Sequence, residues 1–135
     1  MAVKISVLVR NARLDAIEAT IGVSAVLMIR EGAAPAGIAD ADSGAVLATL
    51  TLPVDWMGDA AIGAKALAGV WSDTVADNTG TAGHFRIYAS GGVTQHMQGT
   101  ITATGGGGDM TLDSIAIVAG QTVTITACNF TEENA

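Results

Sequence analysis

"HFRIYASGGVTQHMQGTIT", residues 84–102, is the stretch that decides the fold. Apolar and polar residues alternate on both sides of a Ser-Gly-Gly turn, which is the pattern of a half-buried β-hairpin. A two-residue turn would set the apolar face of one strand against the polar face of the other. A three-residue turn instead pairs Phe85 with Met97 and Arg86 with His96. We therefore predict the second register, because it gives both strands one apolar face for the core.

The polar face of this predicted hairpin carries four side chains that can take part in chemistry. His84, Arg86 and Tyr88 come from the first strand and His96 from the second. Such groups can serve acid–base catalysis, but no carboxylate or nucleophile is expected beside them. Two histidines without a third ligand also make a poor zinc site. The pattern favours a polar outer face, or a patch of Arg86, Tyr88 and His96 that contacts a partner. Gln95 falls on the apolar face, which this register does not explain.

Turn-rich segments separate the hairpin from several other predicted strands. Strands are expected at 24–32, 45–52, 110–113 and 121–130, with a loop and then a short strand at 55–71. Loops are expected at 33–44, 72–83 and 103–110, and the last five residues are expected to fray. Six or seven short strands without βαβ alternation or an internal repeat indicate an all-β fold. We predict one antiparallel β-sandwich domain over 1–135, jelly-roll-like or immunoglobulin-like.

One amphipathic helix is predicted near the start of the chain, in "RNARLDAIEATIG", residues 10–22. Asn11 is expected to cap its first turn and Gly22 to end it. Its apolar stripe consists of Leu14, Ile17 and Ile21. A helix of about three turns is marginal alone, so this stripe must pack on something. It either covers one end of the sandwich in its own chain, or residues 1–22 form an arm that packs on a neighbouring subunit.

The composition predicts a protein that gains stability from its neighbours. The 135 residues include 25 Ala and 17 Gly, and only 4% are aromatic, so few large side chains are available for a core. Ordering a chain costs roughly 1.5 kcal/mol per residue, which such a core offsets poorly. We therefore expect a homo-oligomer, or docking onto a larger body.

The charge excludes two classes of partner. The net charge is -7, and no Lys or Arg follows Arg86. Nucleic acids and anionic membrane surfaces need a cationic footprint, so neither is an expected partner. No apolar run approaches the roughly 20 residues of a membrane-spanning helix, and no signal peptide is visible. We expect the protein to be made and used without export.

The remaining candidate sites have ordinary structural explanations. The glycine run at 105–109 lacks the Lys-Ser/Thr of a phosphate-binding loop. "DADSG", residues 40–44, begins like a calcium loop but lacks its later ligands. Cys128 stands alone, so it is expected to be a small buried hydrophobe. We predict no catalytic residue, metal or cofactor. Trp56 and Trp71 are expected to pack in the core or at its rim. Because Trp often anchors interfaces, Trp56, in a loop, is also the best single candidate for a partner-contact residue.

Four segments together resemble a group of small proteins of tailed bacteriophages and prophages. They are "RNARLDAIEATIG" (10–22), "LATLTLPVDWM" (47–57), "GTAGHFRIYASGG" (80–92) and "GTITATGGGGDMTLD" (99–113). The likeness covers about residues 8–127, and its motifs are structural, so no functional residues are carried over.

The resemblance implies a virion component made in the bacterial host cytoplasm, most plausibly a capsid decoration protein that binds and stabilises the lattice of the major capsid protein. A tail or head–tail connector accessory protein, which would contact other virion proteins, is the next choice. A receptor- or carbohydrate-binding module of a fibre is a further alternative.

Overall fold

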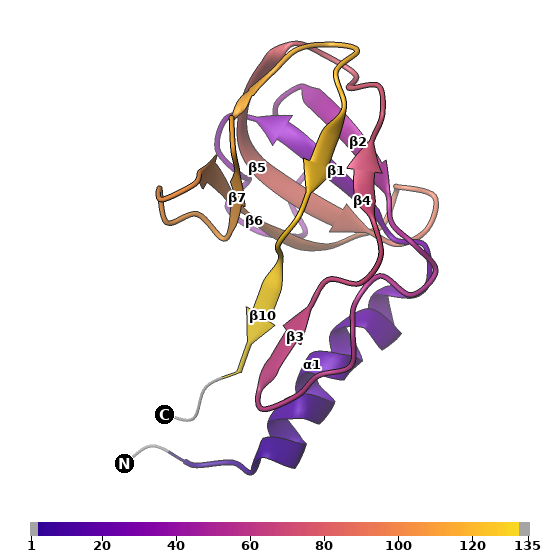
Figure 1. Cartoon of the computed structure of the whole chain (residues 1–135), viewed down its shortest axis with the longest axis vertical. Helices are drawn as coiled ribbons and strands as arrows, with labels where there is room; N and C mark the ends of the chain where they lie inside the picture. The colour runs from indigo at the N-terminus through magenta and orange to yellow at the C-terminus, as the bar shows by residue number, and fades with distance from the viewer. Residues whose placement is uncertain (1–2, 133–135) are drawn as a thin grey trace.

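The computed structural model describes residues 3–132, which form a curled β-sheet body and a stalk (Figure 1). The stalk contains the helix α1 (Val7–Ile21) and the paired strands β3 (Ala64–Ala66) and β10 (Asn129–Thr131). The body contains the remaining strands: β1 (Val26–Glu31), β2 (Val46–Thr51), β4 (Trp71–Asp73), β5 (Gly80–Tyr88), β6 (Gln95–Ala103), β7 (Met110–Leu112), β8 (Ala116–Ile117) and β9 (Val123–Ile125). The prediction of a mostly β chain with one helix near its start is confirmed.

The main sheet has the strand order β2-β1-β5-β6-β7, and β8 pairs with the first residues of β5. A second pair, β4 and β9, lies beside the outer edge of β2. Side chains join the two: the Thr49 N–H donates to Asp73 Oδ2 at 3.0 Å, and the Thr49 hydroxyl donates to Asp77 Oδ2 at 2.8 Å. The strands therefore curl around one core, and β9 comes round towards the far edge strand, β7.

The sheet is mixed, so the prediction of a purely antiparallel arrangement is wrong. β7 pairs with β6 in parallel, with Ile101 opposite Met110. Parallel neighbours usually need a long crossover, but only six residues separate these strands. The glycine run makes the short return possible, because Gly105 and Gly107 adopt positive φ angles of 88° and 80°. A β-carbon at Gly108 would also lie 2.9 Å from the Thr102 backbone nitrogen.

The 84–102 hairpin forms, but its register differs by two residues from the prediction. Ile87 lies opposite Met97 and Arg86 opposite Gln98, so the two faces are assigned correctly while the pairs are not. The connection is longer than three residues, and a β-bulge at His96 shifts the register between Ile87 and Tyr88. Because a bulge adds one residue to one strand, Gln95 moves to the polar face opposite Tyr88. The unexplained position of Gln95 is thereby resolved.

The helix begins earlier than the sequence suggested. Ser6 is the N-cap, and its hydroxyl accepts a hydrogen bond from the Val9 N–H at 3.3 Å. Asn11 was predicted for this role, but it lies inside the helix and its side chain accepts from the Gly63 N–H at 2.9 Å. The predicted end is confirmed, since Gly22 has a φ of 93° and its N–H donates to Glu18 O.

The apolar stripe of α1 packs on its own chain. Leu14 and Ile21 are buried, and Ile17 is packed against the core while keeping some exposed surface. Of the two alternatives for this stripe, packing within the chain is confirmed. Residues 1 and 2 of the predicted arm lie outside the described residues.

The C-terminal strand predicted at 121–130 is two strands, β9 in the body and β10 in the stalk. The connection between them lets one segment serve both parts of the molecule (Figure 1). Thr131, placed in the fraying tail by sequence, belongs to β10, and 133–135 lie outside the described residues. The loop predicted at 72–83 is shorter, because β4 runs to Asp73 and β5 begins at Gly80. Within the described part of the chain, no helix has the length and apolarity to cross a membrane.

Candidate binding surfaces

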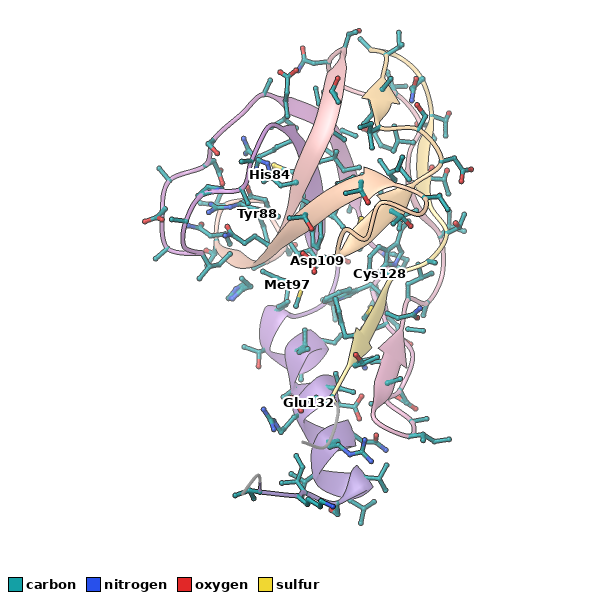
Figure 2. The ribbon with its side chains drawn as sticks, turned by 90° about the vertical axis from the view of Figure 1, so that its left-hand side faces the viewer. His84, Tyr88, Met97, Asp109, Cys128 and Glu132 are labelled. Carbon is teal, nitrogen blue, oxygen red and sulfur yellow. The ribbon has the colours of Figure 1, made fainter. Side chains whose placement is uncertain are left out.

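The polar face of the hairpin is buried, so its predicted role as an outer face is wrong. His84 and Arg86 are 0% exposed, and Tyr88 is also buried. The loop 33–44 passes over this side of the sheet, where Figure 2 shows His84 and Tyr88. These side chains therefore have no surface to offer a partner.

Arg86 fixes the covering loop to the sheet. Its guanidinium donates to Asp42 Oδ1 at 2.8 Å and to the carbonyl oxygens of Asp40 and Gly37 at 3.0 and 3.1 Å. It also donates to Gln98 Oε1 on the neighbouring strand at 2.8 Å. A buried charge is tolerated when it is paired and hydrogen-bonded in this way. Arg86 is thus a structural residue that orders a long loop.

Asp42 is the anion at the centre of this network. It accepts from Arg30 at 3.0 Å, from Arg86 at 2.8 Å and from the Tyr88 hydroxyl at 2.7 Å. Burial alone would raise the pKa of Asp42, but the hydrogen bonds from Tyr88 and Arg86 and the charges of both arginines outweigh it and hold the pKa below its ordinary value. Because two guanidiniums occupy this carboxylate, "DADSG" does not act as the calcium loop that its first residues resemble.

The two histidines lie in different environments. His84 Nδ1 is 2.8 Å from Gly32 O, while its Nε2 is buried without a hydrogen-bond partner among the described residues. His96 is exposed and lines a hollow of about 300 Å³ that also includes Ile17, Ile21 and Met97. Three of the predicted contact residues, Ile17, Ile21 and His96, therefore meet where α1 joins the sheet, and Figure 2 shows Met97 at this junction. Arg86 and Tyr88 lie elsewhere.

Trp56 is part of the core, so it has no surface with which to contact a partner. Its ring is 0% exposed and lies 5.8 Å from the ring of Trp71, centroid to centroid. The indole N–H donates to Gly22 O at 3.0 Å, and the Trp56 backbone N–H donates to Glu18 Oε1 at 2.9 Å. Trp56 therefore connects the C-terminal end of α1 to β4, at the joint between stalk and body.

Charged side chains hold the inner side of the stalk together. Lys65 on β3, almost fully buried, contacts Asp15 Oδ1 at 2.9 Å and Glu18 Oε2 at 3.2 Å on α1. Midway along the helix, Arg13 forms an ion pair of 3.0 Å with Glu132, which Figure 2 shows beside the helix. With Arg30 and Arg86 also engaged, the cations are largely neutralised within the chain, and the net charge of -7 is carried by the surface.

The opposite side of α1 is apolar and exposed. Its residues are Leu8, Val9, Ala12, Ala16 and Ala19, which we call the outer face of the stalk. With 3.6 residues per turn these positions share one side of the helix, and Leu8 is 76% exposed. Solvent-facing sides of helices normally carry polar or charged residues. The outer face of the stalk is therefore a candidate contact surface.

Ile62 lies at the same end of the stalk as Leu8, in the turn before β3. It is 86% exposed and has a φ of 53°, in the left-handed region that β-branched residues rarely adopt. The N–H of the next residue, Gly63, donates a hydrogen bond to Asn11 Oδ1 on α1. Backbone strain of this kind clusters at functional positions, so Ile62 is a second candidate contact residue.

A groove of about 370 Å³ lies between the edges of β7 and β9. Its walls include Thr111 and Leu112 on one side and residues 122–124 on the other. Asp113, Ser114 and Gln121 come from the connection between these strands. The groove is the opening left where the curled strands do not meet.

Among residues 3–132, no cluster of three or more His, Cys, Asp and Glu side chains has an arrangement that would hold a metal ion. Cys128 is buried as predicted, and burial raises the pKa of its thiol to about 11.

Compared with models of protein families, with curated proteins and with solved structures, the chain matches none.

Sequence reasoning missed the residues that organise both parts of the molecule. Asp42 was placed in a loop without a role of its own, and Lys65 was not singled out at all. The available signal for Asp42 was a strand with polar residues at 84, 86 and 88 together with a twelve-residue loop containing two aspartates. A buried arginine needs a carboxylate, and that loop holds two of those that precede the hairpin in sequence.

Proposed function

We propose that the protein is a structural component of a tailed-bacteriophage virion, and specifically a capsid decoration protein that binds the lattice of the major capsid protein. The observation that carries the proposal is the exposed, apolar outer face of the stalk. It supports adhesion through a projecting element, and the resemblance of four segments to phage virion proteins supports the assignment to a virion.

The stalk is suited to insertion between other proteins. The outer face of the stalk is made of small and branched apolar side chains, so another helix or strand can approach the backbone of α1 closely. Burying such surface contributes about 25 cal/mol per Å². Many copies on one lattice multiply a weak single contact through avidity. A protein that binds only the assembled lattice also stabilises it, because binding shifts the equilibrium towards the bound state.

A finer description of the fold belongs to the same proposal. We place the body among the β-sandwiches, jelly-roll-like or immunoglobulin-like, and treat 1–135 as one domain. In support, Trp71 on β4 and Ile125 on β9 share one core with Leu27 on β1 and Ile87 on β5. These residues come from two separately paired strand groups, and a sandwich would place the two groups on opposite sides of that core.

The decisive experiment locates the protein in virions of the phage or induced prophage that encodes it. Quantitative mass spectrometry of purified particles should find hundreds of copies per head. A dozen or fewer copies would support a connector or tail accessory protein instead. Complete absence from particles would overturn the virion proposal.

Charge placed on the outer face of the stalk should abolish lattice binding. We expect Ala12→Glu combined with Ala16→Glu to keep the fold, since Glu is a good helix former and both sites are exposed. When added to capsids that lack the protein, this variant should bind at least about 100-fold more weakly, because two carboxylates would be desolvated without partners. Val75→Glu, at an exposed site on the body, is the matched control and should bind normally. Equal binding of both variants would place the contact elsewhere.

Ile62→Asn should separate stability from binding. Asn tolerates the left-handed region, so relief of strain should raise the free energy of unfolding by about 1 kcal/mol. Loss of the exposed apolar side chain should at the same time weaken binding to capsids. Urea denaturation and capsid co-sedimentation measure the two effects, with Val75→Asn as the control. A variant that is more stable and binds as well as the wild type would remove Ile62 from the contact surface.

A further inference from the structure

We propose that the outer face of the stalk is covered by the same face of a second copy of this chain, with the two α1 helices antiparallel. The inference deepens the proposed function, because it names what occupies this face before the protein meets a capsid. Only that order of events rests on the proposed function, since the pairing itself is a property of the purified protein.

The outer face leaves room for another helix to lie against α1. Figure 1 shows β3 and β10 on one side of α1, and the buried residues of the helix are Leu14 and Ile21. The opposite side carries the small residues Ala12, Ala16 and Ala19, which are all exposed. Small side chains at a helix contact let the two axes approach to about 8 Å.

The two ends of this face differ in shape. Near the start of α1, Leu8 projects from the surface and is 76% exposed. Near the end of α1, a hollow of about 520 Å³ is lined by Ala19, Gly22, Val23 and Val54. Val23 and Val54 are 61% and 66% exposed, so the apolar lining of the hollow is open to a partner. A projecting apolar side chain at one end and an apolar hollow at the other make the face complementary to itself.

Antiparallel pairing brings the projection and the hollow together at both ends. Leu8 lies four residues before Ala12, or about 6 Å along the axis, and Ala19 lies three residues after Ala16, or about 4.5 Å. With Ala12 opposite Ala16 of the second copy, each Leu8 therefore enters the hollow beside Ala19 of the other chain. A parallel pair would set Leu8 against Leu8 and leave both hollows unfilled. The two contacts are related by a two-fold axis, so the pair closes as a dimer.

The charges at the two ends favour the same orientation. Lys4, four residues before Leu8, is exposed and forms no ion pair within residues 3–132. Asp55 and Asp59 line the hollow, and their carboxylates have no partner in the described part of the chain. The last turn of α1 contains no basic residue, although a cation is favourable at the negative end of a helix dipole. An antiparallel pair brings Lys4 of each copy to these carboxylates of the other.

Pairing and capsid binding then use the same residues. If the outer face of the stalk is the capsid contact, the two copies must separate before either binds the lattice. The dimer covers an apolar face while the protein is free in solution, and the avidity of many copies on one lattice favours the exchange.

The first test is the association state of the purified full-length protein without capsids, measured by sedimentation equilibrium and native mass spectrometry. The wild type should show a monomer–dimer equilibrium in the micromolar range. Leu8→Ala, at an exposed helical site that alanine suits, should weaken dimerisation about 100-fold, because each dimer loses two buried leucine side chains. Val75→Ala trims an exposed apolar side chain on the body and should leave dimerisation unchanged. A monomeric wild type, or a dimer that Leu8→Ala does not weaken, would overturn the proposal.

Cysteine cross-linking tests the orientation. Facing residues of two helices about 8 Å apart lie within the roughly 7 Å Cα separation that a disulfide spans. Ala12→Cys and Ala16→Cys proteins should each stay largely uncross-linked in oxidised glutathione and should form a covalent dimer when they are mixed. Cys128 is buried, so it does not compete. Efficient cross-linking of each variant with itself, and not with the other, would show a parallel pair and contradict the antiparallel one.

The covalent dimer separates the inference from the proposed function. It should bind capsids poorly, and reduction should restore binding, because the outer face is shared. A covalent dimer that binds capsids as tightly as the reduced proteins would overturn the shared use of this face. A dimeric protein that is absent from virions would overturn the proposed function alone, and a monomeric protein that is abundant in virions would overturn the inference alone.

Discussion

Replacing Asp42 with asparagine is expected to lower the free energy of unfolding by about 3 kcal/mol. The substitution keeps the shape of the side chain but leaves the guanidiniums of Arg30 and Arg86 without their counter-ion. Arg86 is fully buried, and uncompensated buried charge typically costs about 3–5 kcal/mol. We take the lower end because the Asp42 side chain is 39% exposed, so that water partly replaces the lost charge.

Urea denaturation followed by tryptophan fluorescence measures this effect. Asp55→Asn is the matched control, because Asp55 is exposed and has no hydrogen bond or ion pair within residues 3–132. It should change stability by less than about 0.5 kcal/mol. If Asp42→Asn is as mild as this control, the network does not hold the loop 33–44.

The difference in stability between the wild type and Asp42→Asn should depend on pH. The pKa of Asp42 is lower in the folded chain than in the unfolded one, where it is near 3.9. Its contribution to stability is therefore complete above about pH 4 and is lost as the pH falls through the lower, folded-state pKa. The stability difference between wild type and Asp42→Asn should be largest at neutral pH and shrink below pH 4. A difference that stays constant down to pH 2 would contradict the assigned pairing.

Truncation of Trp56 to alanine should cost about 3–5 kcal/mol, the usual range for a large buried aromatic side chain. The loss includes the packing against Trp71 and the hydrogen bond to Gly22 O. Gly22 lies at the end of α1 in the stalk, and Trp71 lies on β4 in the body. Without Trp56, the stalk should therefore lose its fixed attachment to the body. Faster amide hydrogen exchange in α1 than in β1 and β5 would report that loosening.

Trp56→Phe keeps the test informative if the alanine variant does not fold. Phenylalanine retains most of the volume but lacks the N–H, so the expected loss is about 1–2 kcal/mol. It also leaves Trp71 as the only tryptophan, whose fluorescence then reports the core at the joint. A neutral Trp56→Phe together with a mild Trp56→Ala would show that the joint does not depend on this residue.

Local patterns in the sequence predicted the elements that depend on local physics. The alternation in 84–102 assigned both faces of the hairpin, because side chains alternate along any strand. The apolar run at 24–32 and the glycine after Ile21 likewise predicted β1 and the end of α1. These features require no knowledge of what lies across the core.

The errors arose where a distant segment decides the outcome. Periodicity separates two faces of a strand but does not tell which is covered, and Arg86 is covered by a loop 44 residues away in sequence. The β-bulge at His96 shifted the register, and no local signal marks it. Core or rim packing was predicted for Trp56 and is confirmed, but its second role as a contact candidate is wrong, because α1 and β4 enclose it. The parallel pair β6–β7 was missed because short connections usually join antiparallel strands.

The positions of the two chain ends have a mechanical consequence. Val3 precedes α1 in the stalk, and Glu132, which follows β10, is tied to Arg10 and Arg13 on that helix. Tension applied between the ends would first reach these ties and the three-residue pairing of β3 with β10. The longer pairings of β1 with β2 and β5 lie off that line of force. Under load the stalk would yield first, and the curled sheet would keep its shape.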